Sequence, residues 1–276
     1  MYRLSHYLLV AVCLFVFGCG GNNQDQADDM SDFAGDTSFQ EQHDEPRDIA
    51  FEGRGEIISI PVANADAGRA YAIMSEAETE KYLFVIHEWW GLNDYIKQET
   101  ERLAGELGDV HVIALDLYDG KVATTQEQAG EFMQAVSEDR ARAIIQGAIT
   151  MAGDEADIGT IGWCFGGGWS LKASIMAGDQ GEACVMYYGM PVTEANQLAP
   201  IEAPVLGIFA EQDGWITPEV MNNFEKLADA TNTELTTASF DANHAFANPT
   251  QESYVEEAAQ EANAMALNFL KEHLME

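Results

Sequence analysis

Basic residues are scarce in this sequence. Its 276 residues include 13 lysines and arginines against 47 aspartates and glutamates, which gives a formal net charge of -34. A surface with so few cations repels phosphate backbones, so we expect no nucleic-acid partner. It also disfavours direct binding to anionic lipid head groups. Charge of this size is compatible with a salty habitat, where counterions screen the repulsion between like charges.

Long apolar runs are lacking as well. The run YLLVAVCLFVF at 7–17 is about half the length of a membrane-spanning helix, and Arg3 precedes it. The run ends at Gly18 and Cys19, an order that resembles the cleavage site of a bacterial lipoprotein. We therefore expect a signal peptide over 1–19, export to the periplasm or outer surface, and lipid on Cys19 as the only membrane attachment. The alternative is ordinary signal cleavage and secretion as a soluble protein.

Apolar periodicity is missing from residues 20–54, which are rich in acidic and amide side chains. This composition predicts a disordered acidic tether. The remaining residues, 55–276, are long enough to form one sizeable hydrophobic core. No internal repeat is visible. The sequence thus predicts a signal peptide, a tether and a single domain.

Cysteine is also rare, with four in the whole chain. Cys13 lies in the apolar run and Cys19 is the lipid candidate, so only Cys164 and Cys184 remain in the domain. Two cysteines could pair in an oxidising compartment. However, Cys184 lies in ACVMYYG, a strand-like apolar run that favours a packed thiol.

Buried strands alternate with helical patterns along the domain, which predicts an α/β fold with a mostly parallel central sheet and helices on both faces. Ligands of such sheets bind at the carboxyl ends of the strands, and the motifs HEWW, DLY, GWCFGG, EQD and NH all fall there. The expected strands are 56–62, 69–74, 82–88, 110–116, 158–164, 183–189, 203–213 and 234–241. The expected helices are 94–107, 125–151 (one helix or two), 167–177, 217–230 and 251–273.

The segment IGWCFGGGWS at 161–170 holds Cys164 on a glycine-rich bend between a strand and a helix. One interpretation is a buried structural cysteine beside a flexible loop. The other is an exposed nucleophile, whose neighbours Gly162 and Gly166 lack side chains so that strand and helix can pack closely. A thiol nucleophile needs a base that lowers its pKa, and the base needs an orienting acceptor.

His244 in FDANHAFANP and Asp213 in AEQDGWITP are candidates for this base and its acceptor. Their chain order of nucleophile, acid and histidine is the order used by α/β-hydrolases. A solvated loop histidine and an aspartate at a turn or helix start are the ordinary alternatives.

Five motifs in order, VIHEWWGLND, LDLYDG, GWCFGGG, FAEQDGWITP and ANHAF, resemble those of the dienelactone hydrolase family of α/β-hydrolases over residues 55–276. The resemblance implies an α/β-hydrolase fold. It implies cleavage of a small-molecule carboxylic ester, lactone or thioester through an acyl intermediate on Cys164, without a cofactor. It further implies that the backbone N–H groups of Phe165 and Trp89 bind the oxyanion. In the family, the residue matching Glu88 contacts the resting thiol and helps to generate the thiolate.

Aromatic residues gather near these motifs, and all five tryptophans lie there. Trp90, Trp215 and Tyr118 are therefore candidates for a partly aromatic pocket wall, although aromatic side chains are often part of the core. We expect no metal site, because HEWW lacks the second histidine of H-E-x-x-H. The glycines at 166–168 are not followed by Lys-Ser/Thr, which excludes a phosphate-binding loop.

The chain departs from the family at the substrate contacts. Family members that act on an anionic lactone hold its carboxylate with two arginines and a tyrosine. By the resemblance, those positions are Asn248, Gln126 and Gly130 here, while Arg140 and Arg142 lie further along the chain. We therefore expect uncharged esters or lactones as substrates. A non-catalytic ligand-binding lipoprotein and an acyltransferase are the competing hypotheses.

Overall fold

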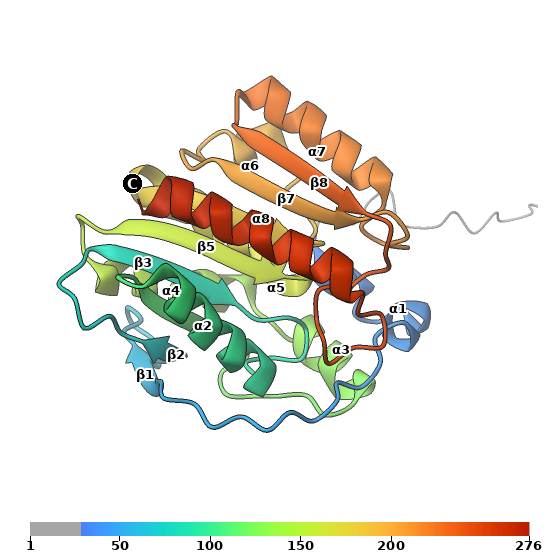
Figure 1. Ribbon diagram of the computed structural model, residues 1–276, viewed down its shortest axis with the longest axis horizontal. Coiled ribbons are helices and arrows are strands. Elements are labelled where there is room, and N and C mark those ends of the chain that lie inside the picture. The colour runs from blue at the N-terminus through green and yellow to red at the C-terminus, as the bar shows by residue number, and fades with distance from the viewer. Residues whose placement is uncertain (1–28, 276) are drawn as a thin grey trace, which may run out of the picture.

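The computed structural model describes residues 29–275 and has an eight-stranded sheet at its centre (Figure 1). The strand order is β1-β2-β4-β3-β5-β6-β7-β8, and every neighbouring pair is parallel except β1–β2 and β2–β4. The predicted mostly parallel sheet is thereby confirmed. The strands are β1 (Glu56–Ile60), β2 (Gly68–Ile73), β3 (Lys81–Ile86), β4 (His111–Asp116), β5 (Asp157–Trp163), β6 (Gly181–Tyr187), β7 (Val205–Ala210) and β8 (Leu235–Phe240).

Helices cover both faces of the sheet, as predicted. In the described residues α2 and α8 pack together over one face, while α4 and α5 pack together over the other (Figure 1). The expected helical region 125–151 is two helices, α3 and α4, separated by residues 135–137, and the side chain of Ser137 caps α4. The α-helices after β3 are α2 (Asp94–Leu107), α3 (Gln126–Gln134), α4 (Glu138–Ala152), α5 (Phe165–Ala177), α6 (Ala195–Leu198), α7 (Pro218–Thr231) and α8 (Glu256–Leu274), and η3 (Gly178–Gln180) is a short 3₁₀ helix.

The carboxyl ends of the parallel strands meet at one edge of the sheet, which we call the carboxyl edge. The strands β3, β6 and β7 are nearly or wholly buried along their length, which agrees with their continuous apolar sequences. The helix α1 (Thr37–Glu41) lies at this edge, whereas the chain ends at the opposite edge (Figure 1).

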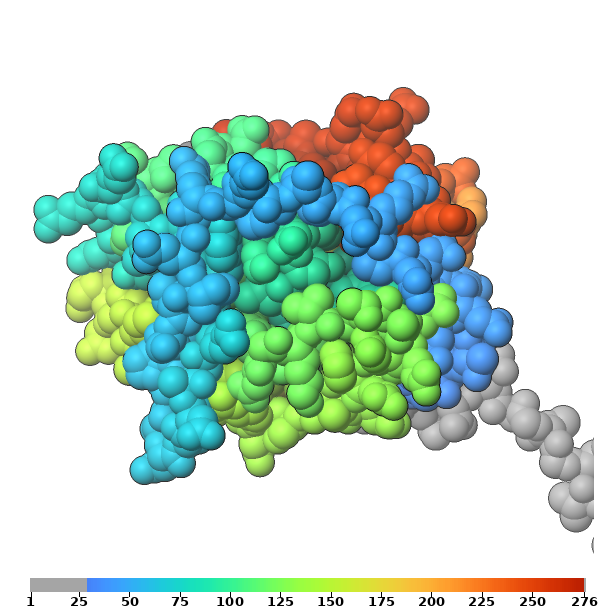
Figure 2. All heavy atoms as spheres, turned by 90° about the horizontal axis from the view of Figure 1, so that it is seen from below, coloured from blue at the N-terminus to red at the C-terminus, as the bar shows by residue number. Residues whose placement is uncertain are grey.

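The N-terminal segment differs from the tether predicted over 20–54. Its described part, from residue 29, forms η2 (Met30–Phe33) and α1, and then crosses the surface to β1 (Figure 2). The short helices are capped by Asp29 and Asp36, whose side chains accept the N–H groups of Ser31 and Ser38. A few widely spaced apolar side chains anchor the segment, although its average composition is polar. The buried ones are Met30, Phe33, Ala34 and Phe39.

The predictions for the first 28 residues, including the signal peptide and the lipid on Cys19, lie outside the described residues. Among residues 29–275, no helix combines the length and apolarity that crossing a bilayer requires.

The two cysteines of the domain are both free and buried, so they do not form the disulfide that was the alternative. Cys184 is a packed residue on β6, as expected from its apolar run, and lies with its Sγ 3.9 Å from the hydroxyl of Ser170. Burial raises the pKa of Cys184 to about 11, which makes its thiol a poor nucleophile.

Candidate active site

Cys164 stands alone between β5, which ends at Trp163, and α5, which begins at Phe165. Its backbone has φ +56° and ψ -122°, a conformation that costs a non-glycine residue about 1–3 kcal/mol. The Cys164 N–H donates to the carbonyl of Tyr187 over 3.0 Å. Strain of this kind is characteristic of a nucleophile held on a sharp strand-to-helix turn.

Glycines make this turn sterically possible. A Cβ on Gly162 would lie 2.0 Å from the carbonyl oxygen of Gly166. A Cβ on Gly166 would lie 2.2 Å from the carbonyl oxygen of Ile86, at the end of β3. Both distances are far below van der Waals contact, so a side chain at either position would push the turn away from the neighbouring strand.

The thiol is buried, and the expectation of an exposed nucleophile was wrong. Cys164 is 1% exposed. The N-terminal segment that was expected to be a tether packs over this region instead. The ring of Phe39 on α1 lies 5.4 Å from that of Trp89 and 5.2 Å from that of Trp215, edge to face in both pairs.

His244 and Asp213 come together as the sequence predicted. Nδ1 of His244 lies 2.5 Å from Oδ2 of Asp213, and both side chains are buried. The other carboxylate oxygen, Oδ1, accepts the N–H groups of Trp215 and Ile216, each over 2.9 Å. Burial alone would raise the pKa of Asp213, but His244 and these donors outweigh it and hold that pKa below its usual value.

The imidazole of His244 also lies near the thiol. One ligand atom from each of His43, Cys164 and His244 falls within 4.8 Å of the others. Burial opposes a charged imidazole, yet the neighbouring Asp213 and Cys164 outweigh burial and raise the pKa of His244 well above its usual value. His244 is therefore suited to accept a proton from the thiol.

Glu88 is buried beside this group and bonds to Asn248, whose Nδ2 donates to Oε2 over 2.6 Å. The other oxygen, Oε1, has no hydrogen-bond partner among the described residues, so the contact with the resting thiol that the resemblance implied is not a hydrogen bond in this structure. Burial raises the pKa of Glu88 to about 7, with Asn248 and His244 acting against it. This carboxyl can therefore exchange a proton near neutral pH.

The loop after β3 carries the expected oxyanion donor Trp89, and His87 fixes that loop. Nε2 of His87 accepts the N–H of Leu117 over 3.1 Å, so its Nδ1 carries the proton and donates to the carbonyl of Glu88 over 2.6 Å. The other expected donor, the N–H of Phe165, is the first in α5 and has no acceptor within the helix. The contact of the glycine turn with the end of β3 brings these two loops together.

The three candidate pocket residues are all buried, but their surroundings differ. Trp215 lines a pocket of about 480 Å³ together with Met190 and Phe224. Tyr118 packs with its ring 5.4 Å from that of Phe165, and Trp90 packs 4.9 Å from Trp89. Of the three, Trp215 thus lines this pocket, whereas Tyr118 and Trp90 pack against other aromatic rings.

Three aromatic residues near His244 were not predicted from the sequence. The rings of His43 and Tyr188 lie 5.0 Å and 4.9 Å from that of His244, and the ring of Phe39 lies 6.4 Å away. The only local signal was the spacing of Phe39 and His43, which places both on one face of a helical turn. Tyr188 gave no signal beyond its place at the end of the apolar run of β6.

Three positions correspond to residues that hold a substrate carboxylate in the family that the sequence resembles. In this chain they contact other parts of the protein. Gln126 donates to the carbonyl of His43 over 2.8 Å, and a Cβ on Gly130 would lie 2.8 Å from the carbonyl oxygen of Ala34. Both positions therefore face the N-terminal segment. Asn248 is committed to Glu88.

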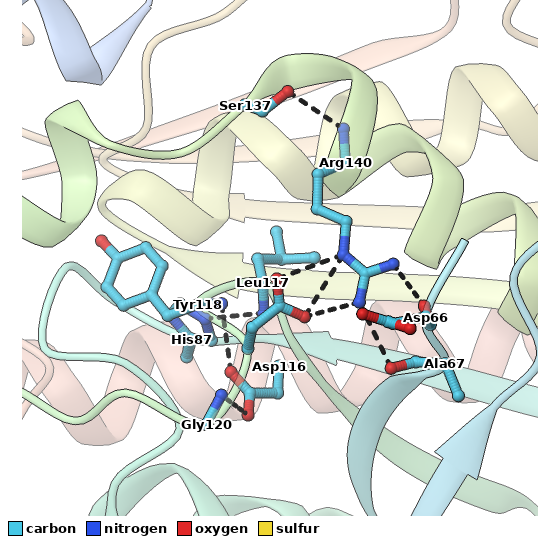
Figure 3. A network of polar contacts seen from close by, with 10 residues as sticks. Asp66, Ala67, His87, Asp116, Leu117, Tyr118, Gly120, Ser137 and Arg140 are labelled. Carbon is cyan, nitrogen blue, oxygen red and sulfur yellow. Dashed lines mark hydrogen bonds and ion pairs between the residues drawn. The ribbon is translucent and has the colours of Figure 1, made fainter.

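The two arginines further along the chain do not replace the missing carboxylate-binding residues, because both are paired with acidic side chains. Arg140 pairs with Asp119 and donates to the carbonyls of Asp66 and Ala67 over 2.6 and 3.2 Å (Figure 3). Arg142 pairs with Glu138 on its own helix over 2.9 Å.

A mostly parallel sheet, covered on both faces and carrying a strained residue at a strand-to-helix turn, defines the α/β-hydrolase class of folds. Residues 69–274 match the profile of the dienelactone hydrolase family, and the chain belongs to that family. The fold and the family expected from the five motifs are thus confirmed.

Individual relatives agree with this assignment. Protein usf of Aquifex pyrophilus is 29% identical over 205 residues, covering 70% of this chain and 88% of that protein. An Aquifex aeolicus protein provisionally named carboxymethylenebutenolidase is 28% identical with the same coverage. The crystal structure of a provisionally named dienelactone hydrolase from Klebsiella pneumoniae has a TM-score of 0.68 at 23% identity, covering 79% of this chain and 98% of that one. At that identity the structural likeness bears on the fold alone.

Proposed function

We propose that this protein hydrolyses carboxylic esters, lactones or thioesters through an acyl intermediate on Cys164. The observation that carries the proposal is the line of three side chains at the carboxyl edge. Cys164 on its strained turn lies within reach of His244, which is held by Asp213 over 2.5 Å. This arrangement supports the proposed roles of nucleophile, base and orienting acceptor, which covalent catalysis requires in that order.

In the first half of the reaction, His244 takes the thiol proton while Sγ of Cys164 forms a bond to the carbonyl carbon of the substrate. The bond to the leaving oxygen or sulfur then breaks, and the leaving group takes the proton from His244. In the second half, His244 removes a proton from water, which attacks the acyl carbon. The carbon–sulfur bond breaks, and the proton returns to the thiol. Asp213 stabilises the imidazolium formed in each half.

The tetrahedral intermediate carries a negative charge on the former carbonyl oxygen. The backbone N–H groups of Phe165 and Trp89 are its proposed donors, and the positive end of the α5 dipole adds to their effect. Glu88 is the proposed second acceptor for the thiol proton, which its pKa of about 7 permits.

The substrate class that we propose is an uncharged ester or lactone. The positions of the two carboxylate-binding arginines and the tyrosine make other contacts here, and Arg140 and Arg142 are already paired. The charge of -34 on the chain further disfavours the approach of an anion. We also propose that the protein is exported and anchored through lipid on Cys19.

Turnover of a short p-nitrophenyl ester by matched cysteine variants tests the mechanism. Cys164→Ala should abolish hydrolysis, and because the thiol is buried it should lose at most the small stability that a cavity of one sulfur atom costs. Cys184→Ala is the control, because that cysteine is packed on β6 and far from the reaction; it should keep the rate and lose some stability through a small cavity. Full activity of Cys164→Ala would contradict its role as nucleophile and leave Cys164 a structural cysteine, whereas no turnover by the unaltered chain would favour the ligand-binding hypothesis.

A further inference from the structure

The carboxyl edge holds a compact group of three side chains that can bind a metal, and the proposed mechanism gives a role to only two of them. His43 comes from the N-terminal segment, Cys164 from the turn before α5 and His244 from the loop after β8. All three are buried, and one ligand atom of each lies within 4.8 Å of the others. His43 has no part in the hydrolysis described above.

In both imidazoles Nδ1 is held by an oxygen atom and Nε2 is left without a hydrogen-bond partner among the described residues. Nδ1 of His43 donates to the carbonyl of Phe39 over 2.7 Å, since a carbonyl oxygen can only accept. Nδ1 of His244 lies against the carboxylate of Asp213. In each ring Nε2 is buried and has no hydrogen-bond partner among the described residues. Imidazoles that bind metal are held in this way, with the second nitrogen fixed by a carbonyl or carboxylate.

We propose that His43, Cys164 and His244 form a Zn²⁺ site that blocks the catalytic thiol. Thiolate sulfur and imidazole nitrogen are preferred Zn²⁺ ligands, at about 2.3 Å and 2.0–2.1 Å. Tetrahedral coordination at those lengths places the ligand atoms roughly 3.5 Å apart, so distances that now reach at most 4.8 Å must shorten by up to about 1.3 Å. Three protein ligands leave the fourth position for water.

Binding proceeds by a simple exchange. Zn²⁺ forms a bond to Sγ of Cys164, the single proton held by the Cys164–His244 pair leaves to solvent, and the Nε2 lone pairs of His43 and His244 complete the protein ligands. No electron is transferred. The ion then occupies both the nucleophile and the base, so hydrolysis stops. This inhibition rests on the proposed function, whereas the binding itself does not. The excess of acidic residues on the chain raises the local concentration of divalent cations.

Titration of the purified full-length chain with Co²⁺, a spectroscopic substitute for Zn²⁺, tests the site. A thiolate-to-cobalt charge-transfer band in the near ultraviolet should saturate at one ion per chain, and Zn²⁺ should displace it. Cys164→Ser should lose the band. His43→Gln should weaken binding by at least about tenfold, the loss expected even for a residue that supports a metal ligand. His273→Gln on α8, at the opposite edge of the sheet, should bind as the unaltered chain does.

Inhibition of p-nitrophenyl ester hydrolysis by Zn²⁺ gives a second measurement, taken relative to each variant's own metal-free rate. His43→Gln should need at least about tenfold more Zn²⁺ for half-inhibition. Equal cobalt affinity in His43→Gln would overturn the three-ligand site and leave a simple Cys–His pair, and the lack of any charge-transfer band would overturn it entirely. A saturating band in a chain without esterase activity would refute the proposed function and leave the metal site standing. Circular dichroism confirms that each variant is folded.

Discussion

Nδ2 of Asn248 donates a hydrogen bond to Oε2 of Glu88 over 2.6 Å and so joins the loop after β8 to the loop after β3. The amide is held in turn by Thr250, whose N–H and hydroxyl donate to its Oδ1 over 2.9 and 2.7 Å. An arginine at this position would bring a positive charge against Glu88 and lower its pKa. The neutral amide leaves burial dominant, and the pKa of Glu88 is raised to about 7.

The raised pKa of Glu88 predicts a pH-dependent stability. The folded protein binds this proton more tightly than the unfolded chain does, so the contribution of Glu88 is fully present below pH 4.5 and is lost as the pH rises to about 7. Glu88→Gln should therefore increase the free energy of unfolding at pH 8, by up to ~3 kcal/mol, and change it little at pH 4.5. Urea unfolding at the two values measures this. The exposed Glu106→Gln is the control, and an identical effect of Glu88→Gln at both values would contradict the prediction.

The contact of Asp213 with His244 predicts a large loss of rate in Asp213→Asn. An amide cannot stabilise the imidazolium, and it favours the wrong tautomer of His244. We expect kcat to fall roughly 10³–10⁴-fold with the fold retained. Stopped-flow or long-time assays of p-nitrophenyl ester turnover give this value. Asp241→Asn is the matched control, because Asp241 is exposed and bonds to Gln212 in the same region. A loss of kcat below tenfold would show that Asp213 holds its loop in place and does not take part in catalysis.

The burial of Phe39 predicts that the N-terminal segment limits the access of reagents to the thiol of Cys164. Its ring is fully buried against Trp89 and Trp215, so Phe39→Ala removes the main apolar anchor of α1 at a cost of about 3–5 kcal/mol to the packing of the segment. Alkylation of Cys164 by iodoacetamide, followed by peptide mass spectrometry, should become at least several-fold faster. Phe269→Ala on α8, near the opposite edge, should leave the alkylation rate as it is. Equal rates in all three proteins would show that the segment does not restrict the thiol.

The engaged side chains around the site predict a preference for uncharged substrates. A substrate carboxylate would lack the charge-assisted hydrogen bonds that an arginine supplies, each contributing ~1.5–3 kcal/mol, or roughly ten- to a hundredfold in kcat/KM. The measurement compares an acyl ester with its carboxylate-bearing analogue at low and high salt. Long-range repulsion is screened at high salt, but the missing contact is not, so a preference of at least about tenfold should remain. A higher kcat/KM for the anion would refute the proposed substrate class.

The short apolar run and Cys19 predict a modified N-terminus. Mass spectrometry of the protein from its native membrane fraction should find Cys19 as the first residue, carrying acyl chains. Cys19→Ala should leave the precursor uncleaved or release the protein from the membrane. Cleavage at another residue, with Cys19 unmodified, would favour secretion as a soluble protein.

Much of the fold could be predicted from the sequence, because its signals are local. The apolar runs of β3 and β7 and the period of α2 depend on residues a few positions apart. The turn at Cys164 could also be predicted from the sequence, since Gly162 and Gly166 lie where a Cβ would collide with the backbone. The pair His244 and Asp213 could be anticipated from chain order, because parallel strands bring their carboxyl ends to one edge.

Other features depended on packing between distant segments. Averaged over residues 20–54, the composition indicated disorder, but a few buried apolar side chains dock the segment, and Phe39 places α1 beside Trp215, which lies far along the chain. That docking buries the thiol and brings His43 to it. Pairing of Arg140 with Asp119 likewise depends on how α4 lies against the loop after β4.

The sequence by itself therefore determined the order of strands and helices, the strained turn and the identity of the nucleophile candidate, because these follow from steric rules and periodicities within short stretches. Only the tertiary structure decided that the thiol is closed to solvent, that Asn248 binds Glu88, and that His43 faces His244. Such contacts join residues 160 to 201 positions apart, and no local pattern encodes which of many polar or aromatic partners a side chain will meet once the core has closed.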